Sequence, residues 1–116
     1  MPFELVWTEE AAQTFEQLQA DAEHAKANRQ KSKRTKASKQ EGLFKQVVKC
    51  VTLLAENPRH PSLNTHEYHS LEHPYSKDAK VFEAYVQNRT PGAYRLFWCY
   101  GPEQKDITII AITPHP

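Results

Sequence analysis

The chain has 116 residues and a formal net charge of +1, with 39% hydrophobic residues, 25% charged residues and three glycines. These figures are typical of one globular domain with one core, and they exclude collagen-like and low-complexity proteins. No apolar stretch approaches the roughly 20 residues that span a bilayer. The first residues also lack the pattern of a secretory signal peptide. We therefore predict one domain over residues 1–116, in a cytoplasmic protein that has no membrane partner.

The charge is distributed very unevenly. Residues 25–40 hold seven basic residues and no acid, whereas the other 100 residues hold 8 basic and 14 acidic residues, a balance of −6. This pattern predicts a mildly acidic body that carries one cationic segment. The segment is either a contact for phosphate backbones or a solvated surface, because lysine is also a good helix former. Its basic residues are Lys26, Arg29, Lys31, Lys33, Arg34, Lys36 and Lys39.

The first half of the chain predicts a strand followed by two helices. Residues 3–7 alternate as in a short strand, and Thr8 can cap a helix whose first turn holds Glu9 and Glu10. The cationic segment extends this helix and then turns, which gives a basic helical-hairpin extension at about residues 26–40. The apolar positions of the first helix are three or four residues apart, at Ala11, Phe15, Leu18, Ala22 and Ala25.

The second helix is predicted to begin near Ser38, with Glu41 completing a capping box. It ends at Asn57, because the following Pro58 disfavours helical geometry at the residue before it. Two helices with facing apolar sides form a hairpin that must pack on another layer. The apolar positions of the second helix are Phe44, Val47, Val48, Val51, Leu54 and Ala55.

The second half of the chain predicts four strands. Short turns join the last three, which indicates antiparallel neighbours. The last strand is apolar throughout, as expected for a strand covered on both faces. The predicted class is α+β, with an N-terminal strand and a helical hairpin packed on a small, mainly antiparallel twisted sheet. The strands are expected at 63–71, which is weak, and at 80–87, 94–100 and 107–113.

Local motifs accompany this order of elements at residues 3–11, 54–58, 92–98 and 107–116. They read FELVWTEEA, LAENP, GAYRLFW and ITIIAITPHP. Together they resemble the RelE/ParE superfamily of type II toxin–antitoxin toxins over the whole chain except roughly residues 26–40, which are longer and more basic than usual in that family. The resemblance implies a RelE/ParE-like fold and a cognate antitoxin protein as partner.

The resemblance implies one of several activities. Members resembling RelE cut mRNA on the ribosome, and members resembling ParE inhibit DNA gyrase without being nucleases. We predict the first activity, a metal-independent mRNA endoribonuclease (an mRNA interferase) that needs no cofactor and whose partners are mRNA and the ribosome. The alternatives are a ParE-like or degenerate binding module, and a protein that mainly forms a DNA-binding complex with its antitoxin. Operator DNA would then be contacted only through that complex.

Cleavage of RNA through its 2′-hydroxyl needs a base, an acid and a cation near the phosphate. Arg95 is the first candidate for the cation, because a charge inside an apolar strand is costly unless it opens onto a site. It also matches the family's sheet arginine, which the resemblance implies to be a phosphate-stabilising residue. The alternative is an arginine that pairs with an acid such as Glu83 and holds the sheet together.

Histidine suits either proton-transfer role near neutral pH. His115 follows the last strand, where the resemblance implies a catalytic arginine or histidine. His66 and His69 are further candidates, but they face opposite sides of a regular strand, so at most one is expected to enter a central cleft. The spacing of these histidines does not suit a metal site. The predicted RNA contacts are Lys31, Lys33, Arg34, Lys36, Lys80 and Arg89, and Tyr85 and Tyr94 are candidates for base stacking or core packing.

Overall fold

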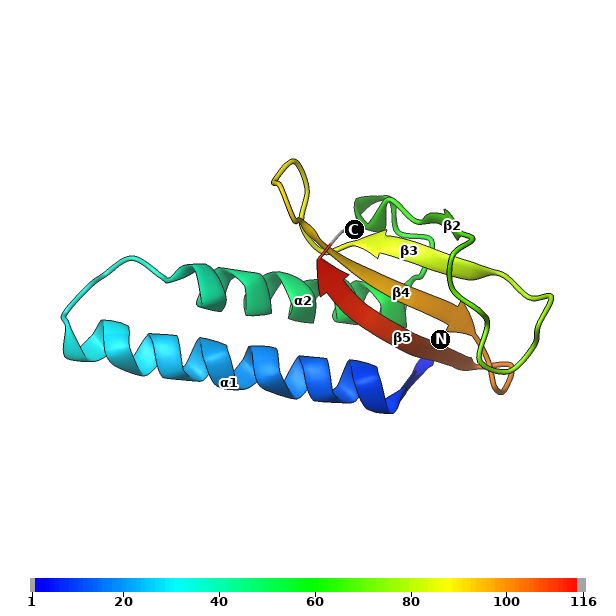
Figure 1. Cartoon of the computed structure of the whole chain (residues 1–116), viewed down its shortest axis with the longest axis horizontal. Helices are drawn as coiled ribbons and strands as arrows, with labels where there is room; N and C mark the ends of the chain where they lie inside the picture. The colour runs from blue at the N-terminus through cyan, green and yellow to red at the C-terminus, as the bar shows by residue number, and fades with distance from the viewer. Residues whose placement is uncertain (1, 115–116) are drawn as a thin grey trace.

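The computed structural model describes residues 2–114. A strand and two helices are followed by a short 3-10 helix and four more strands, as Figure 1 shows, and the predicted α+β class is confirmed. The elements are β1 (Glu4–Trp7), α1 (Glu9–Lys31), α2 (Lys39–Glu56), the 3-10 helix (Pro61–Leu63), β2 (His66–Tyr68), β3 (Val81–Tyr85), β4 (Tyr94–Tyr100) and β5 (Asp106–Pro114).

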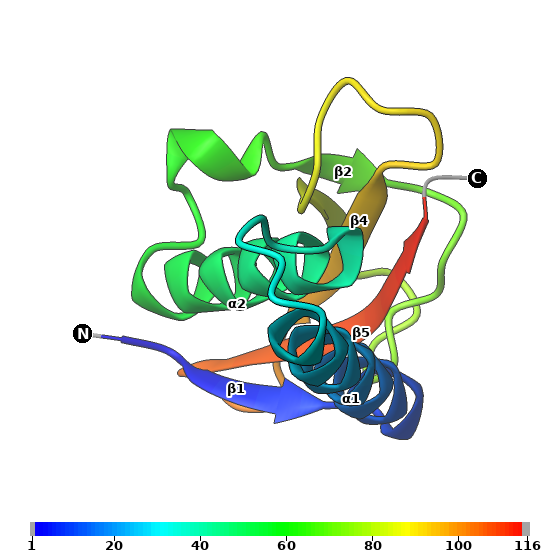
Figure 2. The same ribbon diagram turned by 90° about the vertical axis from the view of Figure 1, so that its left-hand side faces the viewer.

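The five strands form one sheet in the order β1-β5-β4-β3-β2. β1 runs parallel to β5, and the other neighbours are antiparallel, as predicted for the last three strands. The antiparallel helices α1 and α2 pack on the sheet and extend past it, which makes the molecule 51 Å long and only 26 by 24 Å across (Figures 1 and 2). None of the helices among residues 2–114 is long and apolar enough to cross a membrane.

Both helices begin at the predicted caps. The Thr8 hydroxyl accepts a hydrogen bond from the Ala11 amide at 3.1 Å. Ser38 and Glu41 form the full capping box, in which each side chain bonds the other residue's amide. These caps satisfy amide groups that a helix leaves unpaired at its start. Asn57 ends α2, as the following proline predicts.

The core lies between the helical hairpin and the sheet. Trp7 of β1 packs its ring against Phe15 of α1 at 5.0 Å between centroids, and Phe15 contacts Phe44 of α2 at 5.3 Å. One aromatic row therefore joins the sheet to both helices. The prediction that Val48 belongs to the buried side of α2 is wrong, because Val48 is 40% exposed. It lies on the outer side of the hairpin, where it lines a shallow apolar groove between the helices.

A bulge in β5 decides which residues face the core. Phe97 lies opposite Ala111 and Trp98 lies opposite Ile109, so Ile110 has no partner residue in β4. The Thr8 hydroxyl donates to the Ile110 carbonyl at 2.7 Å, and the Thr8 amide donates to the Ile109 carbonyl at 3.1 Å. The start of α1 therefore satisfies the carbonyl groups around the bulge.

The predicted strand at 63–71 is wrong in its extent, because only His66–Tyr68 pairs with the sheet. Pro61 begins a 3-10 turn instead, and Asn64 ends it in the left-handed conformation with φ of 48°. The chain then leaves the sheet edge after Tyr68 and forms a loop. The Tyr75 hydroxyl lies 2.9 Å from the Thr108 hydroxyl and ties this loop to β5. The predicted strand at 80–87 is likewise shorter, at Val81–Tyr85.

Arg29 and Glu41 hold the free end of the helical hairpin together. The Arg29 Nε and Nη2 atoms donate to the Glu41 carboxylate at 2.9–3.2 Å. These hydrogen bonds from Arg29, followed by that from the Ser38 amide, lower the pKa of Glu41 to about 2. The same carboxylate thus caps α2 and fixes the end of α1.

Replacing Thr8 by alanine is expected to lower the free energy of unfolding by about 2 kcal/mol, because it removes a helix cap and the hydrogen bond to the Ile110 carbonyl. Thr8→Ser keeps the hydroxyl and should lose much less. Urea unfolding of the two variants measures the difference. Equal stability of Thr8→Ala and Thr8→Ser would show that the hydroxyl does not support the bulge.

Glu41→Gln keeps a side chain that can cap Ser38 but removes the charge that pairs with Arg29. Because the folded-state pKa of Glu41 lies below its ordinary value of 4.5, the pairing stabilises the fold fully above that value and is lost as the pH falls towards 2. Wild type should therefore exceed Glu41→Gln in stability at pH 7, and the difference should vanish between about pH 4.5 and 2. Glu23→Gln, at an exposed glutamate of α1, serves as the control for urea unfolding at each pH.

Candidate active site

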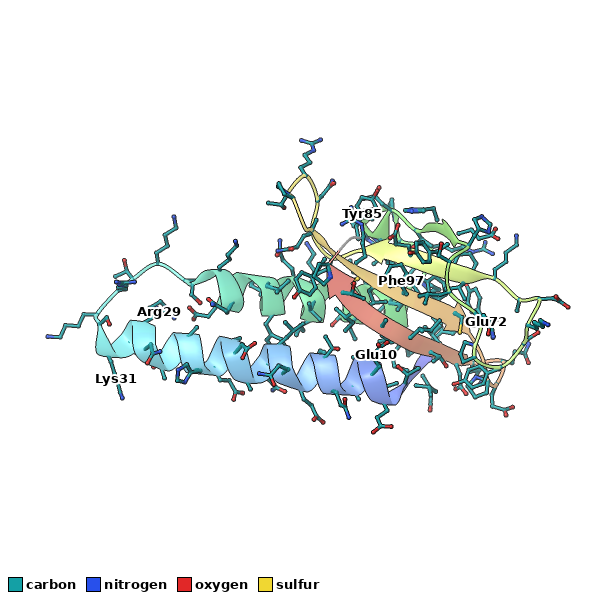
Figure 3. All side chains as sticks on the ribbon, viewed as in Figure 1. Glu10, Arg29, Lys31, Glu72, Tyr85 and Phe97 are labelled. Carbon is teal, nitrogen blue, oxygen red and sulfur yellow. The ribbon has the colours of Figure 1, made fainter. Side chains whose placement is uncertain are left out.

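Charged and aromatic side chains gather on one face of the sheet, across β2, β3 and β4. His66 lies opposite Glu83, and Tyr85 lies opposite Arg95. Alternation along β3 and β4 places these four residues, together with Phe97, on the same face, whereas Ala84 and Leu96 point into the core. Figure 3 labels Tyr85 and Phe97 on the sheet.

Arg95 is buried, with 7% of its surface exposed. Its Nη1 donates to the carbonyl oxygens of Gln87 at 2.7 Å and of Tyr94 at 3.2 Å. Its guanidinium carbon lies 3.7 Å from the centroid of the Tyr85 ring, which is a cation–π contact. Within residues 2–114, its buried Nε has no hydrogen-bond partner. A buried donor without a partner typically costs about 1–3 kcal/mol, so this edge of the guanidinium can gain from an anion.

His66 connects the sheet edge to a buried acid. Its Nε2 lies 2.5 Å from Glu83 Oε1, and its Nδ1 lies 3.1 Å from the Asn64 carbonyl oxygen. Its ring meets the Tyr85 ring edge-on at 5.8 Å. The His66 side chain is half exposed, whereas Glu83 is buried. The histidine is therefore open to solvent on one side and held by a buried carboxylate on the other.

These contacts have a chemical meaning. Glu83 Oε1 as a carboxylate oxygen and the Asn64 carbonyl both accept hydrogen bonds, so a ring with protons on both nitrogens satisfies both contacts. That form can deliver a proton, and the half-exposed ring can exchange it. Arg95 brings a permanent positive charge to the same face. The cluster combines a proton-transfer group with a charge that can stabilise an anion.

Glu83 entered the sequence analysis only as a possible partner of Arg95. The strand register places it opposite His66, on the same face as Arg95. The sequence does mark Glu83 as unusual, because it is the only charged residue between Val81 and Val86. Arg95 is likewise the only charged residue within residues 94–100. Two charges inside two neighbouring apolar strands predict a shared polar site.

The other predicted site residues on this half of the molecule lie around the cluster. His69 follows the end of β2, is highly exposed, and has its Nδ1 3.5 Å from Glu67 Oε2. The Lys80 Nζ lies 3.7 Å from the same carboxylate, at Oε1. Arg89 is exposed in the turn between β3 and β4, in the left-handed conformation with φ of 62°. His115 lies outside the described residues.

The remaining predicted RNA contacts lie at the free end of the hairpin. Lys31 ends α1, and Lys33, Arg34 and Lys36 are exposed in the turn that leads to α2. Figure 3 shows Lys31 and Arg29 at the free end of the hairpin, well away from Tyr85 and Phe97 on the sheet. The structure therefore separates the cationic segment from the cluster around Arg95.

The two thiols are poor candidates for nucleophiles. Burial raises the pKa of Cys50 to about 12 and that of Cys99 to about 11, so few thiolates exist at neutral pH. Among residues 2–114, no group of three or more His, Cys, Asp or Glu side chains is arranged to hold a metal ion. The polar chemistry of the described sheet is therefore concentrated in the cluster of His66, Glu83, Tyr85 and Arg95.

No protein-family model and no curated protein matches the sequence. Solved structures match the fold along nearly the whole chain. A YoeB/ParE toxin from Agrobacterium tumefaciens aligns with a TM-score of 0.62 and 10% identity, over 97% of this chain and 99% of that chain. The archaeal RelE–RelB complex from Pyrococcus horikoshii OT3 aligns with a TM-score of 0.57 and 13% identity, over 98% of this chain and 96% of that chain.

The YoeB dimer from Staphylococcus aureus aligns over 100% of both chains, with a TM-score of 0.57 and 9% identity. At such identities the likeness concerns the fold. The two helices and five-stranded mixed sheet of this chain match the fold of these toxins. The chain therefore has the fold of the RelE/ParE toxin superfamily, as its sequence motifs predict.

Proposed function

We propose that this protein is the toxin of a type II toxin–antitoxin system and cleaves ribosome-bound mRNA without a metal ion. The observation that carries the proposal is the cluster on the sheet face opposite the helices, where the Arg95 Nε, which has no hydrogen-bond partner within residues 2–114, lies on the same face as the His66–Glu83 pair. The fold supports a toxin but does not separate nucleases from gyrase inhibitors. The chemistry of the cluster favours the nuclease.

In the proposed reaction, the 2′-oxygen of a nucleotide attacks the adjacent phosphorus and the bond to the 5′-oxygen breaks. The 2′-hydroxyl gives its proton to a base, and an acid gives a proton to the departing 5′-oxygen. The products are a 2′,3′-cyclic phosphate and a 5′-hydroxyl. Arg95 stabilises the negative charge that develops on the phosphate oxygens. His66 supplies the proton from Nδ1, which exchanges its hydrogen bond to the Asn64 carbonyl for one to the departing oxygen, while Glu83 holds the ring at Nε2.

His115 is proposed as the second proton-transfer group, because it follows β5 directly in the sequence. The described end of β5 pairs Thr113 with Arg95 and Pro114 with Tyr94. Lys80 and Arg89, near the two ends of β3, are proposed to contact the RNA on either side of the cluster.

One observation favours the binding-module alternative. Arg95 is buried beneath Tyr85, and its Nη1 bonds two main-chain carbonyl groups, an arrangement that also suits a purely structural arginine. Because the Arg95 Nε is itself buried, a phosphate reaches the guanidinium only after a covering side chain such as Tyr85 moves. Mapping of RNA ends after induced expression separates the two functions, because only the nuclease creates new 5′-hydroxyl ends within messages.

The antitoxin is proposed to bind the helical hairpin. A shallow apolar groove between α1 and α2 is lined by Ala22, Phe44 and the exposed Val48. Leu43, which precedes Phe44 on α2, is half-buried and packs against the core rather than lining this groove. One of the structural neighbours is a RelE–RelB complex, which supports a protein partner for this fold. A partner helix with apolar side chains on one face suits such a groove.

Arg95→Ala is expected to lower the rate of mRNA cleavage by about 10²–10³-fold at every pH, the usual effect of removing one preorganised charge or donor. The measurement is single-turnover cleavage of ribosome-bound mRNA. Arg59→Ala, an exposed arginine near the end of α2, is the matched control and should keep the wild-type rate. Urea unfolding confirms that the Arg95 variant folds. A folded Arg95→Ala protein that cuts at the wild-type rate contradicts the proposed role.

His66→Gln is expected to lower the same rate by about 10²–10⁴-fold, the scale of general acid–base catalysis. His69→Gln is the matched control, because His69 is exposed and contacts Glu67. If His69→Gln lowers the rate and His66→Gln keeps it, the proton-transfer role belongs to His69. A wild-type protein that never cuts leaves the binding-module alternative.

A further inference from the structure

The free end of the helical hairpin encloses a hollow. It lies between the last turns of α1, the turn at residues 32–38 and the start of α2, and its volume is about 1150 Å³. Pockets for drug-sized molecules hold roughly 300–1,000 Å³, so this space exceeds what a small anion needs. Figures 1 and 3 show this end of the molecule projecting away from the sheet.

The frame of the hollow is held by polar contacts within the chain. Arg29 bonds Glu41 across the hairpin, and its carbonyl oxygen accepts from the Arg34 amide at 3.0 Å. Lys33 takes the left-handed conformation with φ of 56°, which reverses the chain direction. Because Arg29 is paired with Glu41, it holds the two helices together and its positive charge is largely neutralised. The turn is therefore ordered by contacts that leave its other basic side chains available.

Those side chains make the hollow strongly cationic. Lys33, Arg34 and Lys36 line it, and Lys31 flanks it at the end of α1. All four are exposed and form no ion pair within the described part of the chain. Asp21, near the inner end, is the one acid among the lining residues. Serine and threonine hydroxyls at Ser32 and Thr35 add neutral hydrogen-bonding groups.

We propose that this hollow binds the phosphodiester backbone of folded RNA. Four exposed cations and two hydroxyls around an open space suit several successive phosphates better than one free anion. The choice of RNA over DNA rests on the proposed function. Because the hollow lies at the free end of the hairpin, away from the sheet that carries Arg95, it contacts RNA away from the cleaved bond. It supplies affinity, whereas the cluster on the sheet supplies the chemistry.

The test uses the full chain and a fluorescent RNA hairpin whose 2′-positions are O-methylated, so that the proposed cleavage cannot occur. Binding is followed by fluorescence anisotropy at a series of salt concentrations. The variant replaces Lys31, Lys33, Arg34 and Lys36 by glutamine. The control replaces Lys45, Lys49, Lys77 and Lys105, which are exposed elsewhere, so both variants lose the same charge. Urea unfolding checks that both fold.

The variant with glutamine at positions 31, 33, 34 and 36, called the tip variant, is expected to lose about 10²–10³-fold in affinity for the RNA hairpin at 0.1 M salt. The slope of log affinity against log salt should fall by about 0.9 for each phosphate that the variant no longer neutralises. The control variant should change much less in both affinity and slope. Equal changes in the two variants overturn the proposal, because net charge alone then explains binding. Tighter binding of a duplex DNA of the same sequence, or equal binding of polyglutamate, overturns the choice of RNA.

The outcome separates this proposal from the nuclease. Wild-type cleavage of mRNA together with unchanged RNA binding by the tip variant would remove the hollow as an RNA site and leave the nuclease in place. If the protein never cuts mRNA but its RNA binding is weakened in the tip variant, the hollow remains an RNA site and the nuclease proposal is removed.

Discussion

The contact between Thr8 and the bulge in β5 determines how the two layers of this molecule meet. One hydroxyl group caps α1 and also bonds the Ile110 carbonyl, which lies where β5 carries an extra residue. The extra residue shifts the alternation of β5, so that Ile112 joins the core with Ile109 while Thr113 lies opposite Arg95. Without that shift, the last residues of β5 would present the opposite faces to the core and to the cluster.

Local signals explain why much of the fold is predictable. The caps at Thr8 and Ser38 depend on residues within three positions, and the prolines after Asn57 and Gly101 interrupt helix and strand directly. The bulge at Ile110 was not predictable, because residues 107–112 are apolar almost throughout and show no alternation to break. The strand predicted at 63–71 was too long for a related reason, since a 3-10 turn at Pro61 and the αL residue Asn64 compete with an extended chain.

The candidate site was predictable in part. Arg95 stands out because it is charged within an apolar strand, whereas the relation of His66 to Glu83 depends on the pairing of strands some 17 residues apart in the sequence. No local pattern gives that register. The Tyr85 ring covers the Arg95 guanidinium because the register between β3 and β4 places these two residues opposite each other. The segment of seven basic residues was evident, but its separation from the sheet follows from the length of α1 and α2.

The elongated shape has an electrical consequence. Seven positive charges lie within residues 26–39 at one end of a molecule 51 Å long, and the rest of the chain has a balance of −6. Charges of opposite sign at such a separation give the protein a large permanent dipole moment along its long axis. In the field of a polyanion, the molecule turns during diffusion so that the hairpin end arrives first. Ionic strength therefore governs how often an encounter begins in the right orientation, apart from how tightly the final complex is held.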